Sequence, residues 1–527
     1  MMNMKKRDVL ARDMNLEDIT SSKKNAEVLR QLRHNIIWDY DNRSTLYIDE
    51  EDDNFNYDFY DTFFIIREGD DLSWLGYFIG RNQSLYDLTM KLPEQREQIG
   101  AFIEGVSYNR SLSVFSLRGF GTNLGLQNLW SFFRENDNLT VIKLCGCEIG
   151  RECARELALA LSQRQVKSLR SLLFRDNNLG DEGFVDIIQA LVTQPELDFL
   201  QCSDNNIGRI SCKALGALLR ERNSNLTSLF VLGNDIDDVG LQELVPGLCS
   251  NNNLRNLSIS DPITAVGLRS LSPFLQSDSC RLDYLCVEMR LGDEEATALT
   301  DALKGNKSLT MLLLPHHDHE NQRRNMTDAG WSAFSKLLCD TSSINNTYLS
   351  NHTLMDIHFC ADSRPFITDL LQMNAAAQKE DTMRNQKIAM QSLTRCKIFM
   401  SHPDLDMKPL FEYKLKLLPW VMGWFRKSKQ LCGEEVGDSI KWYQESVPAL
   451  RRRELSAVYK FVHGMPLLIS DGYWTIVLNE SQTKKHKLQK QRLEAEKRKL
   501  PLMLQKVEKG IKKAEEIERS ASKRLRR

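Results

Sequence analysis

The sequence predicts an α/β solenoid, a curved stack of repeated strand–helix units. Residues 169–180 read Leu-Arg-Ser-Leu-Leu-Phe-Arg-Asp-Asn-Asn-Leu-Gly, a strand with regularly spaced apolar residues followed by a turn that contains asparagine. The pattern recurs at intervals of 27, 27, 30, 28, 29, 28, 28, 27 and 35 residues. Its first apolar residue falls at Leu85, Leu112, Leu139, Leu169, Leu197, Leu226, Leu254, Leu282, Leu309 and Ile344. A near-constant period of this length indicates units that bury their apolar faces against their neighbours.

The strand half of each unit follows the pattern L-x-x-L-x-L-x-x-N-x-L, which defines a leucine-rich repeat. In the copy that begins at Leu169, the side chains of Leu172 and Phe174 point inward, and Asn177 binds backbone groups that the turn leaves open. This turn position is regular only from Cys147 to Asn234. We therefore expect less regular outer repeats, where the position holds Pro93, Phe120, Pro262, Arg290, His317 and His352.

The second half of each unit predicts a helix on the convex side. Phe184, Ile187, Ile188 and Leu191 have helical spacing, and acidic residues open several of these segments, where they suit the positive end of the helix dipole. Pro246 and Pro273 fall inside two of the predicted helices and should bend or shorten them. A pitch of 27–30 residues leaves room for a full helix in each repeat.

Residues 180–191, Gly-Asp-Glu-Gly-Phe-Val-Asp-Ile-Ile-Gln-Ala-Leu, together with the preceding strand and turn, resemble the ribonuclease-inhibitor class of leucine-rich repeats. That class includes the Ran GTPase-activating protein and the repeat domains of NOD-like receptors. The resemblance covers about half of the chain. With its C-terminal part the chain is also similar to the leucine-rich-repeat families of unicellular algae. The resemblance implies a horseshoe-shaped solenoid of about ten repeats that binds proteins on its concave face.

We divide the chain into four parts: a leader and cap at 1–83, the leucine-rich-repeat domain at 84–355, a helical C-terminal cap at 356–480 and a basic helical tail at 481–527. Within the first part, residues 39–71 hold 12 acids among many aromatic residues. We favour a cap over the first repeat for this segment, because the exposed end of a solenoid needs a cover. An acidic–aromatic docking segment remains the alternative.

The C-terminal tail differs in charge from the rest of the chain. Residues 484–527 carry 17 Lys and Arg against 6 Asp and Glu, whereas the whole chain has a net charge of −1. A solvated charged helix is the simplest interpretation, and a nuclear-import signal or an arm that binds nucleic acid or anionic membrane remains open. The start of the chain has no apolar leader, and no run of about 18 apolar residues occurs. These features predict a cytoplasmic protein, with a nuclear location open.

The sequence offers no catalytic motif. It lacks the P-loop, G-x-S-x-G and H-E-x-x-H patterns and paired C-x-x-C motifs, so we predict neither an enzyme nor a bound cofactor. The 12 cysteines are expected to be free, and several occupy core or turn positions. His316, His317 and His319 lie in an insertion in the ninth repeat and form a weak metal candidate. A surface loop is the favoured interpretation there.

The predicted function depends on the strand residues that alternate with the inward leucines and therefore face the concave surface. Aromatic and arginine residues on such a surface favour protein binding. We predict a non-catalytic scaffold that binds a protein or peptide there. The alternatives are a GTPase-activating regulator and attachment to nucleic acid or anionic membrane through the tail. The candidate binding residues are Arg118, Lys143, Leu173, Arg175, Phe199, Phe230, Leu232, Tyr284 and Tyr348.

Overall fold

The structure is a computed structural model of the 527-residue chain. It describes residues 4–35, 44–50, 62–92, 99–119, 126–221, 224–260, 262–289, 291–314, 326–359 and 365–378. Two compact units are distinguished. The first comprises residues 1–337 and 353–368, and the second comprises residues 338–352 and 369–527.

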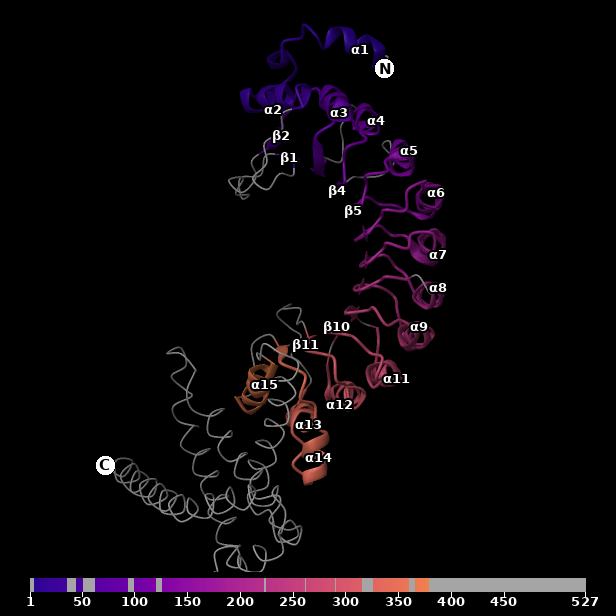
Figure 1. Cartoon of the computed structure of the whole chain (residues 1–527), viewed down its shortest axis with the longest axis vertical. Coiled ribbons are helices and arrows are strands. Elements are labelled where there is room, and N and C mark those ends of the chain that lie inside the picture. Colours follow the sequence, from indigo (N-terminus) through magenta and orange to yellow (C-terminus); the bar gives the residue numbers. More distant parts are fainter. Residues whose placement is uncertain are drawn as a thin grey trace, which may run out of the picture. The chain divides into compact units, whose positions relative to one another are not determined.

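The first unit contains a twelve-stranded, all-parallel sheet in the order β12-β11-β10-β9-β8-β7-β6-β5-β4-β3-β1-β2. The strands line the inner side of the curve in Figure 1. Their bounds are β1 Ser44–Glu50, β2 Phe63–Ile66, β3 Leu85–Lys91, β4 Val114–Arg118, β5 Val141–Cys145, β6 Ser171–Leu173, β7 Phe199–Gln201, β8 Ser228–Phe230, β9 Asn256–Ser260, β10 Tyr284–Glu288, β11 Met311–Leu314 and β12 Asp356–Phe359.

The helices between successive strands cover the outer, convex side of the sheet (Figure 1). They are α4 Ile99–Val106, α5 Gln127–Glu135, α6 Arg151–Ser162, α7 Gly180–Leu191, α8 Arg209–Arg220, α9 Asp238–Ser250, α10 Ala265–Ser270, α11 Ser272–Leu275, α12 Asp293–Ala302 and α13 Asp328–Leu338. Pro273 acts as expected, because the helical segment is split into α10 and the short α11. Pro246 does not shorten α9, a helix of 13 residues that continues past the proline to Ser250.

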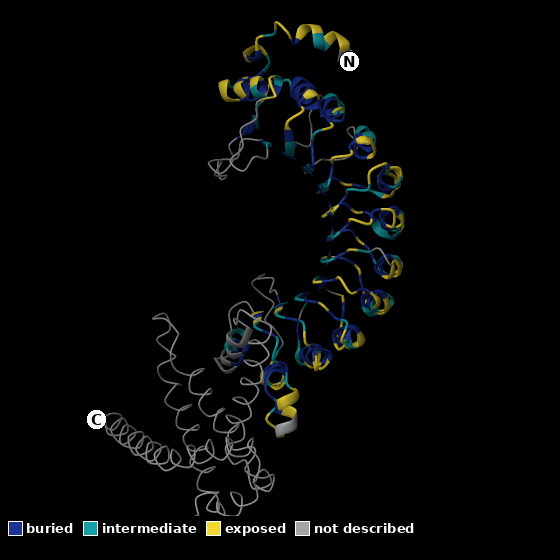
Figure 2. Cartoon of the chain, viewed as in Figure 1, coloured by how far each residue is buried: buried dark blue, intermediate teal, exposed yellow. Residues whose placement is uncertain are grey.

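The core is the layer between the sheet and the outer helices, and it confirms the predicted inward positions. Leu172 pairs in register with Leu200, Leu200 with Leu229, and Leu229 with Leu257. All four side chains are fully buried. Phe174 and Phe184 fill the same layer from the strand and helix halves of one repeat. Figure 2 shows this buried band running between the strands and the helices.

The N-terminal residues extend the sheet by two strands beyond the first predicted repeat. β1 pairs with β3 on one side and with β2 on the other. Phe63 and Phe64 of β2 are buried. The helix α2, Lys23–Arg33, is tied to this edge by Asn25, whose amide Nδ2 donates to Ile65 O (2.6 Å). The other N-terminal helices are α1 Met4–Leu10, the 3₁₀ helix η1 Leu16–Ile19 and α3 Leu72–Arg81.

The sequence prediction was wrong about where the tenth repeat begins. Ile344 lies in a helix, α14 Ile344–Leu349, which belongs to the second unit. The strand that pairs with β11 is β12, in which Leu312 faces Ile357, so the repeat begins at the fully buried Leu354. Tyr348 therefore lies on a helix and not on a strand of the concave sheet.

Other predictions fall on residues that the structure does not describe. These are the aromatic residues of 51–61, the His316, His317 and His319 loop, and the helices and basic tail beyond residue 378. The last described helix is α15, Pro365–Gln378. Over the described ranges, no helix is long and apolar enough to cross a membrane. Those same ranges contain no group of three or more His, Cys, Asp or Glu residues placed to hold a metal ion.

Candidate protein-binding surface

The candidate surface consists of the concave-facing residues of the sheet, arranged in rows by the strand register. One row joins Lys143, Leu173, Gln201 and Phe230 on β5 to β8. A second row, two residues earlier on each strand, joins Val141, Ser171, Phe199 and Ser228. All these side chains are half-buried except that of Ser228, which is buried. In-register parallel pairing thus presents the predicted positions on one continuous face.

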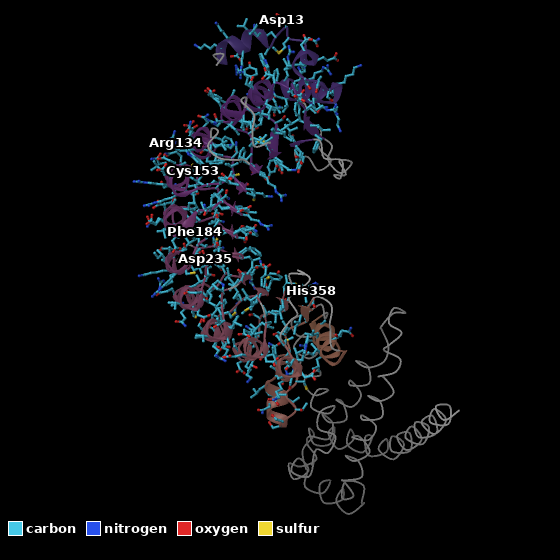
Figure 3. All side chains as sticks on the ribbon, turned by 180° about the vertical axis from the view of Figure 1, so that it is seen from behind. Asp13, Arg134, Cys153, Phe184, Asp235 and His358 are labelled. Atoms are coloured by element: carbon cyan, nitrogen blue, oxygen red, sulfur yellow. The ribbon has the colours of Figure 1, made fainter. Side chains whose placement is uncertain are left out.

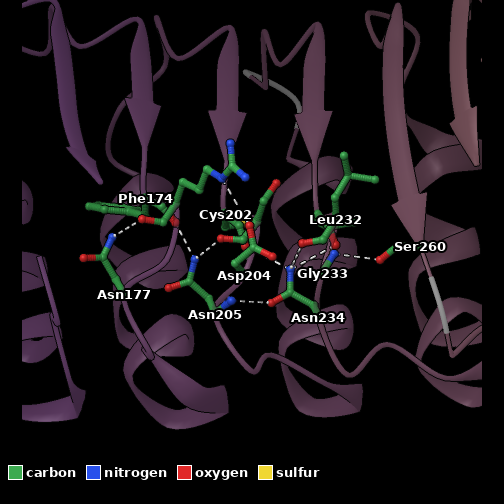
Figure 4. A network of polar contacts seen from close by, with 12 residues as sticks. Phe174, Asn177, Cys202, Asp204, Asn205, Leu232, Gly233, Asn234 and Ser260 are labelled. Carbon is green, nitrogen blue, oxygen red and sulfur yellow. Dashed lines mark hydrogen bonds and ion pairs between the residues drawn. The ribbon is translucent and has the colours of Figure 1, made fainter. Parts of the chain in front are cut away.

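An asparagine ladder fixes the turns that end these strands (Figure 4). Asn177 Nδ2 donates to Leu144 O (2.6 Å), and Asn234 Nδ2 donates to Cys202 O (3.0 Å), each reaching the preceding repeat. Asn205 makes the corresponding bond to Phe174 O. Each amide therefore satisfies backbone groups of an adjacent repeat as well as of its own turn. These bonds confirm the prediction that the turn position is regular from Cys147 to Asn234.

A second ladder, which we did not predict from the sequence, connects the helix ends to the next strands. Asn109 Nδ2 donates to Ile79 O (2.7 Å), and its Oδ1 accepts from the backbone N–H of Ser111 and Leu112. The recurring pattern Asn-x-x-Leu, in which the leucine opens a repeat, was the available signal, although it is absent before Leu169, Leu197 and Leu282. Its buried asparagines are Asn82, Asn109, Asn136, Asn251, Asn306 and Asn351.

Aspartates in alternate repeats cap the N-terminus of the following helix rather than of their own. Asp181 on α7 accepts from Gly208 N (2.8 Å) and Ser211 N (3.1 Å) at the start of α8. Although burial alone raises the pKa of Asp181, hydrogen bonds from Ser211 and Gly208 outweigh it and hold the pKa below its ordinary value. Asp238 and Asp293 make corresponding bonds one repeat onward. These carboxylates therefore link one repeat to the next through side-chain-to-backbone hydrogen bonds.

Phe199 and Phe230 form the centre of the candidate surface. Their ring centroids are 5.2 Å apart with an interplanar angle of 31°. They belong to different rows, so the contact is a diagonal one between β7 and β8. Aromatic pairs at such a centroid separation add about 0.5–1.5 kcal/mol beyond area burial. The structure therefore brings two of the predicted residues into direct contact and orders them on the concave face.

Basic residues lie on the N-terminal side of this pair. Lys143 is the register partner of Leu173, whose own partner on β7 is Gln201, two residues after Phe199. Arg118, at the end of β4, is exposed and forms no ion pair among the described residues. Arg175 Nε lies 3.2 Å from Asp204 Oδ2, in a solvent-exposed pair that contributes about 1 kcal/mol or less.

The remaining predicted residues are more scattered. Leu232 is half-buried just beyond the end of β8. Tyr284 on β10 is separated from the phenylalanine pair by β9, and its register neighbour is Met311, which is 41% exposed. Burial raises the pKa of Tyr284 to about 12, with Cys286 adding to the effect. Tyr348 lies on α14, a helix of the second unit, and not on a strand of the sheet.

The buried thiols do not have the character of nucleophiles. Burial raises the pKa of Cys202, and it raises the pKa of Cys212 to about 12. Reactive thiols instead have lowered pKa values and lie near positive charge. Figure 3 shows Cys153 and Phe184 on the side of the outer helices and His358 on the strand side. Cys153 likewise has a raised pKa because of burial and the nearby Glu152 and Glu156.

Comparison with known proteins supports the repeat class. No family model matches the sequence. NACHT, LRR and PYD domains-containing protein 5 of Bos taurus is 28% identical over 211 residues, 40% of this chain and 19% of that protein. The corresponding protein 3 of Homo sapiens is 25% identical over 277 residues, 46% of this chain and 25% of that protein. Ribonuclease inhibitor of Sus scrofa is 28% identical over 169 residues, 32% of this chain and 36% of that protein.

These matches cover only part of each relative, between 19% and 36% of its length. They therefore bear on the repeats and not on the other domains of the larger proteins. The parallel sheet and the outer helices agree with a leucine-rich-repeat fold. The chain therefore has the fold of a leucine-rich-repeat solenoid and is similar to ribonuclease inhibitor over 32% of its length.

Proposed function

We propose that the chain is a protein-interaction scaffold that binds a protein or peptide on its concave sheet, centred on Phe199 and Phe230. The observation that carries the proposal is the ring pair itself. Two aromatic side chains remain half-exposed on the concave face, whereas the phenylalanines of the repeat core are buried. Aromatic residues that keep apolar surface on a rigid scaffold are typical centres of protein interfaces.

The scaffold supports this use because the surface needs little ordering before binding. Each strand is held by its register partners, and its turn or helix junction is fixed by buried asparagines. A preorganised surface loses less conformational entropy on association than a flexible loop. Relatives in the same repeat class include a protein named ribonuclease inhibitor, and an inhibitor of an enzyme contacts a protein. We carry over only this general mode, protein binding.

The test is a pair of matched double variants of the full chain. In Phe199→Glu with Phe230→Glu, two charges enter the centre of the concave face. In Val239→Glu with Val266→Glu, two charges replace residues that are 38% and 52% exposed near the starts of α9 and α10. We expect the first variant to lose at least about 100-fold in affinity for a captured partner, equal to about 3 kcal/mol. Equal binding by both variants would contradict the proposal.

A second candidate function is attachment to nucleic acid or anionic membrane through residues 481–527. The supporting observation is the excess of 11 positive charges in residues 484–527. Binding to single-stranded RNA and to vesicles containing phosphatidylserine should disappear when this segment is deleted. Binding that persists after the deletion would rule this candidate out. No observation on the described residues favours the GTPase-activating alternative, so we do not propose it.

A further inference from the structure

The charged residues of the concave face are distributed unevenly. The concave-facing residues are Val114, Ser116 and Arg118 on β4, Val141, Lys143 and Cys145 on β5, Ser171 and Leu173 on β6, Phe199 and Gln201 on β7, and Ser228 and Phe230 on β8. Arg175 and Leu232 follow directly after β6 and β8. Basic residues occur on or just after three of these strands, and none of these positions is acidic. The apolar pair and the basic residues are therefore neighbours on one stretch of sheet.

The acidic residues of the sheet face lie elsewhere. Asp49 is on β1, Asp87 is on β3, and Glu288 and Asp356 are on β10 and β12, outside the β4–β8 stretch. Asp204 offsets Arg175 by its ion pair, which leaves Lys143 and Arg118 as the cations of this stretch without a salt bridge among the described residues. Lys143 interacts electrostatically with Asp87. Burial raises the pKa of Asp87 above its ordinary value, and a hydrogen bond from Thr89 and the charge of Lys143 offset part of that rise.

The register sets the spacing between the cation and the aromatic pair. Lys143, Leu173, Gln201 and Phe230 occupy one row, each the direct partner of the next. Neighbouring strands lie about 4.8 Å apart, so three steps give roughly 14 Å between the Lys143 and Phe230 positions. An extended chain advances about 3.3 Å per residue. A partner segment that crosses the strands therefore covers this distance in about four residues.

We propose that the partner presents an extended segment with a carboxylate about four residues from an apolar or aromatic side chain. The carboxylate binds Lys143, with Arg118 near it, and the apolar side chain packs on the Phe199–Phe230 pair. Gln201, between them in the row, offers its amide to the backbone of the segment. Complementary charge at one end and an aromatic anchor at the other give such a surface its specificity. This inference rests on the proposed function, because it names the partner for the same surface.

The test uses a display library of random twelve-residue peptides selected on the immobilised full chain. The Phe199→Glu, Phe230→Glu variant serves to subtract peptides that bind elsewhere. Enriched peptides should carry Asp or Glu three to five residues from an aromatic or large aliphatic residue, in either chain direction. On Lys143→Glu, the same selection should enrich Lys or Arg at that distance. Lys213→Glu, the same exchange at an exposed position on α8, should leave the enriched set unchanged.

Affinity measurements on one enriched acidic peptide sharpen the test. We expect Lys143→Glu to weaken its binding about tenfold, an effect that shrinks as salt is added. Asp87→Asn should strengthen the same binding, because Lys143 then loses its neighbouring carboxylate. These two variants change charge in opposite directions on the same face, so a nonspecific loss of folding cannot produce both results.

The possible outcomes bear differently on this inference and on the proposed function. If the enriched peptides require Phe199 and Phe230 but show no acidic preference, the charge inference is overturned and the scaffold function stands. If no peptide is enriched on the wild-type chain relative to the Phe199→Glu, Phe230→Glu variant, both are contradicted. Acidic enrichment that reverses on Lys143→Glu supports both.

Discussion

The asparagine ladder makes a graded prediction about stability. Asn234 Nδ2 donates to Cys202 O, Val231 O and Leu232 O, and its Oδ1 accepts from Asn205 N (2.9 Å) and Ile207 N (3.3 Å). Its side chain is 5% exposed. Replacement by alanine removes both the donor and the acceptor and leaves buried backbone groups of two repeats without these partners.

The expected magnitude follows from the number of groups left unsatisfied. Each buried polar group that loses its partner costs about 1–3 kcal/mol. For Asn234→Ala, at least one carbonyl and one N–H are affected, so we expect a loss of about 2–6 kcal/mol in the free energy of unfolding. Asn205→Ala should cost less, about 2–3 kcal/mol. The reason is that Asn205 Oδ1 is buried without a hydrogen bond among the described residues, and the substitution removes that unfavourable group.

Hydrogen–deuterium exchange of the full chain, followed by mass spectrometry of its peptides, measures this loss locally. The control is Asn225→Ala, because the exposed Asn225 also bonds a neighbouring repeat, at Pro195 O (2.9 Å). We expect the control to cost less than about 0.5 kcal/mol, because water replaces the lost bond. The order of effects should be Asn234, Asn205, Asn225. An Asn234 effect no larger than that of Asn225 would refute the argument that burial decides the cost.

Three further predictions concern the capping, packing and thiols of the repeats. Asp181→Ala should lower the free energy of unfolding in urea by about 1 kcal/mol at pH 7. Because the pKa of Asp181 is lowered in the folded chain, the stabilisation by its carboxylate is complete above about pH 4 and is lost as the pH falls through the folded pKa. An equal difference in stability between wild type and variant at pH 7 and at pH 2.5 contradicts this prediction. Gly247→Ala should cost about 1–3 kcal/mol, since a Cβ there would lie 2.5 Å from Gly216 Cα, and an unchanged urea midpoint counts against this close approach. Iodoacetamide at pH 8 should label Cys202 and Cys212 only after unfolding, as peptide mass spectrometry will show, and labelling of the native chain would contradict their burial.

The sequence was sufficient to predict the repeat core because each inward position is specified locally. Leu172 and Phe174 alternate with outward residues, and the period of the leucines places them in register with the next repeat. The concave positions of Phe199 and Phe230 followed from the same alternation. Their 5.2 Å contact did not, because a diagonal contact depends on side-chain orientation across two strands.

The error at the tenth repeat has a local cause. Ile344 and Leu349 have the spacing of the first and third inward residues of a repeat strand, with Thr347 at the second position. However, Ser343 accepts a hydrogen bond from Asn346 N (3.1 Å) and caps a helix there. The capping signal of a serine before the segment was the information that spacing alone omitted. The bonds from Asp181 to the start of the next helix were beyond sequence reasoning for another reason. They join residues about one repeat apart, and only the stacking of repeats brings such residues together.

The most direct test of the account is the binding of a captured protein or peptide to three full-length chains: wild type, Phe199→Glu with Phe230→Glu, and Val239→Glu with Val266→Glu. Circular dichroism serves to check that all three chains are folded. We predict that the concave variant loses at least about 100-fold in affinity while the control keeps wild-type affinity. Undiminished binding by a folded concave variant would contradict the claim that Phe199 and Phe230 form the centre of the binding surface.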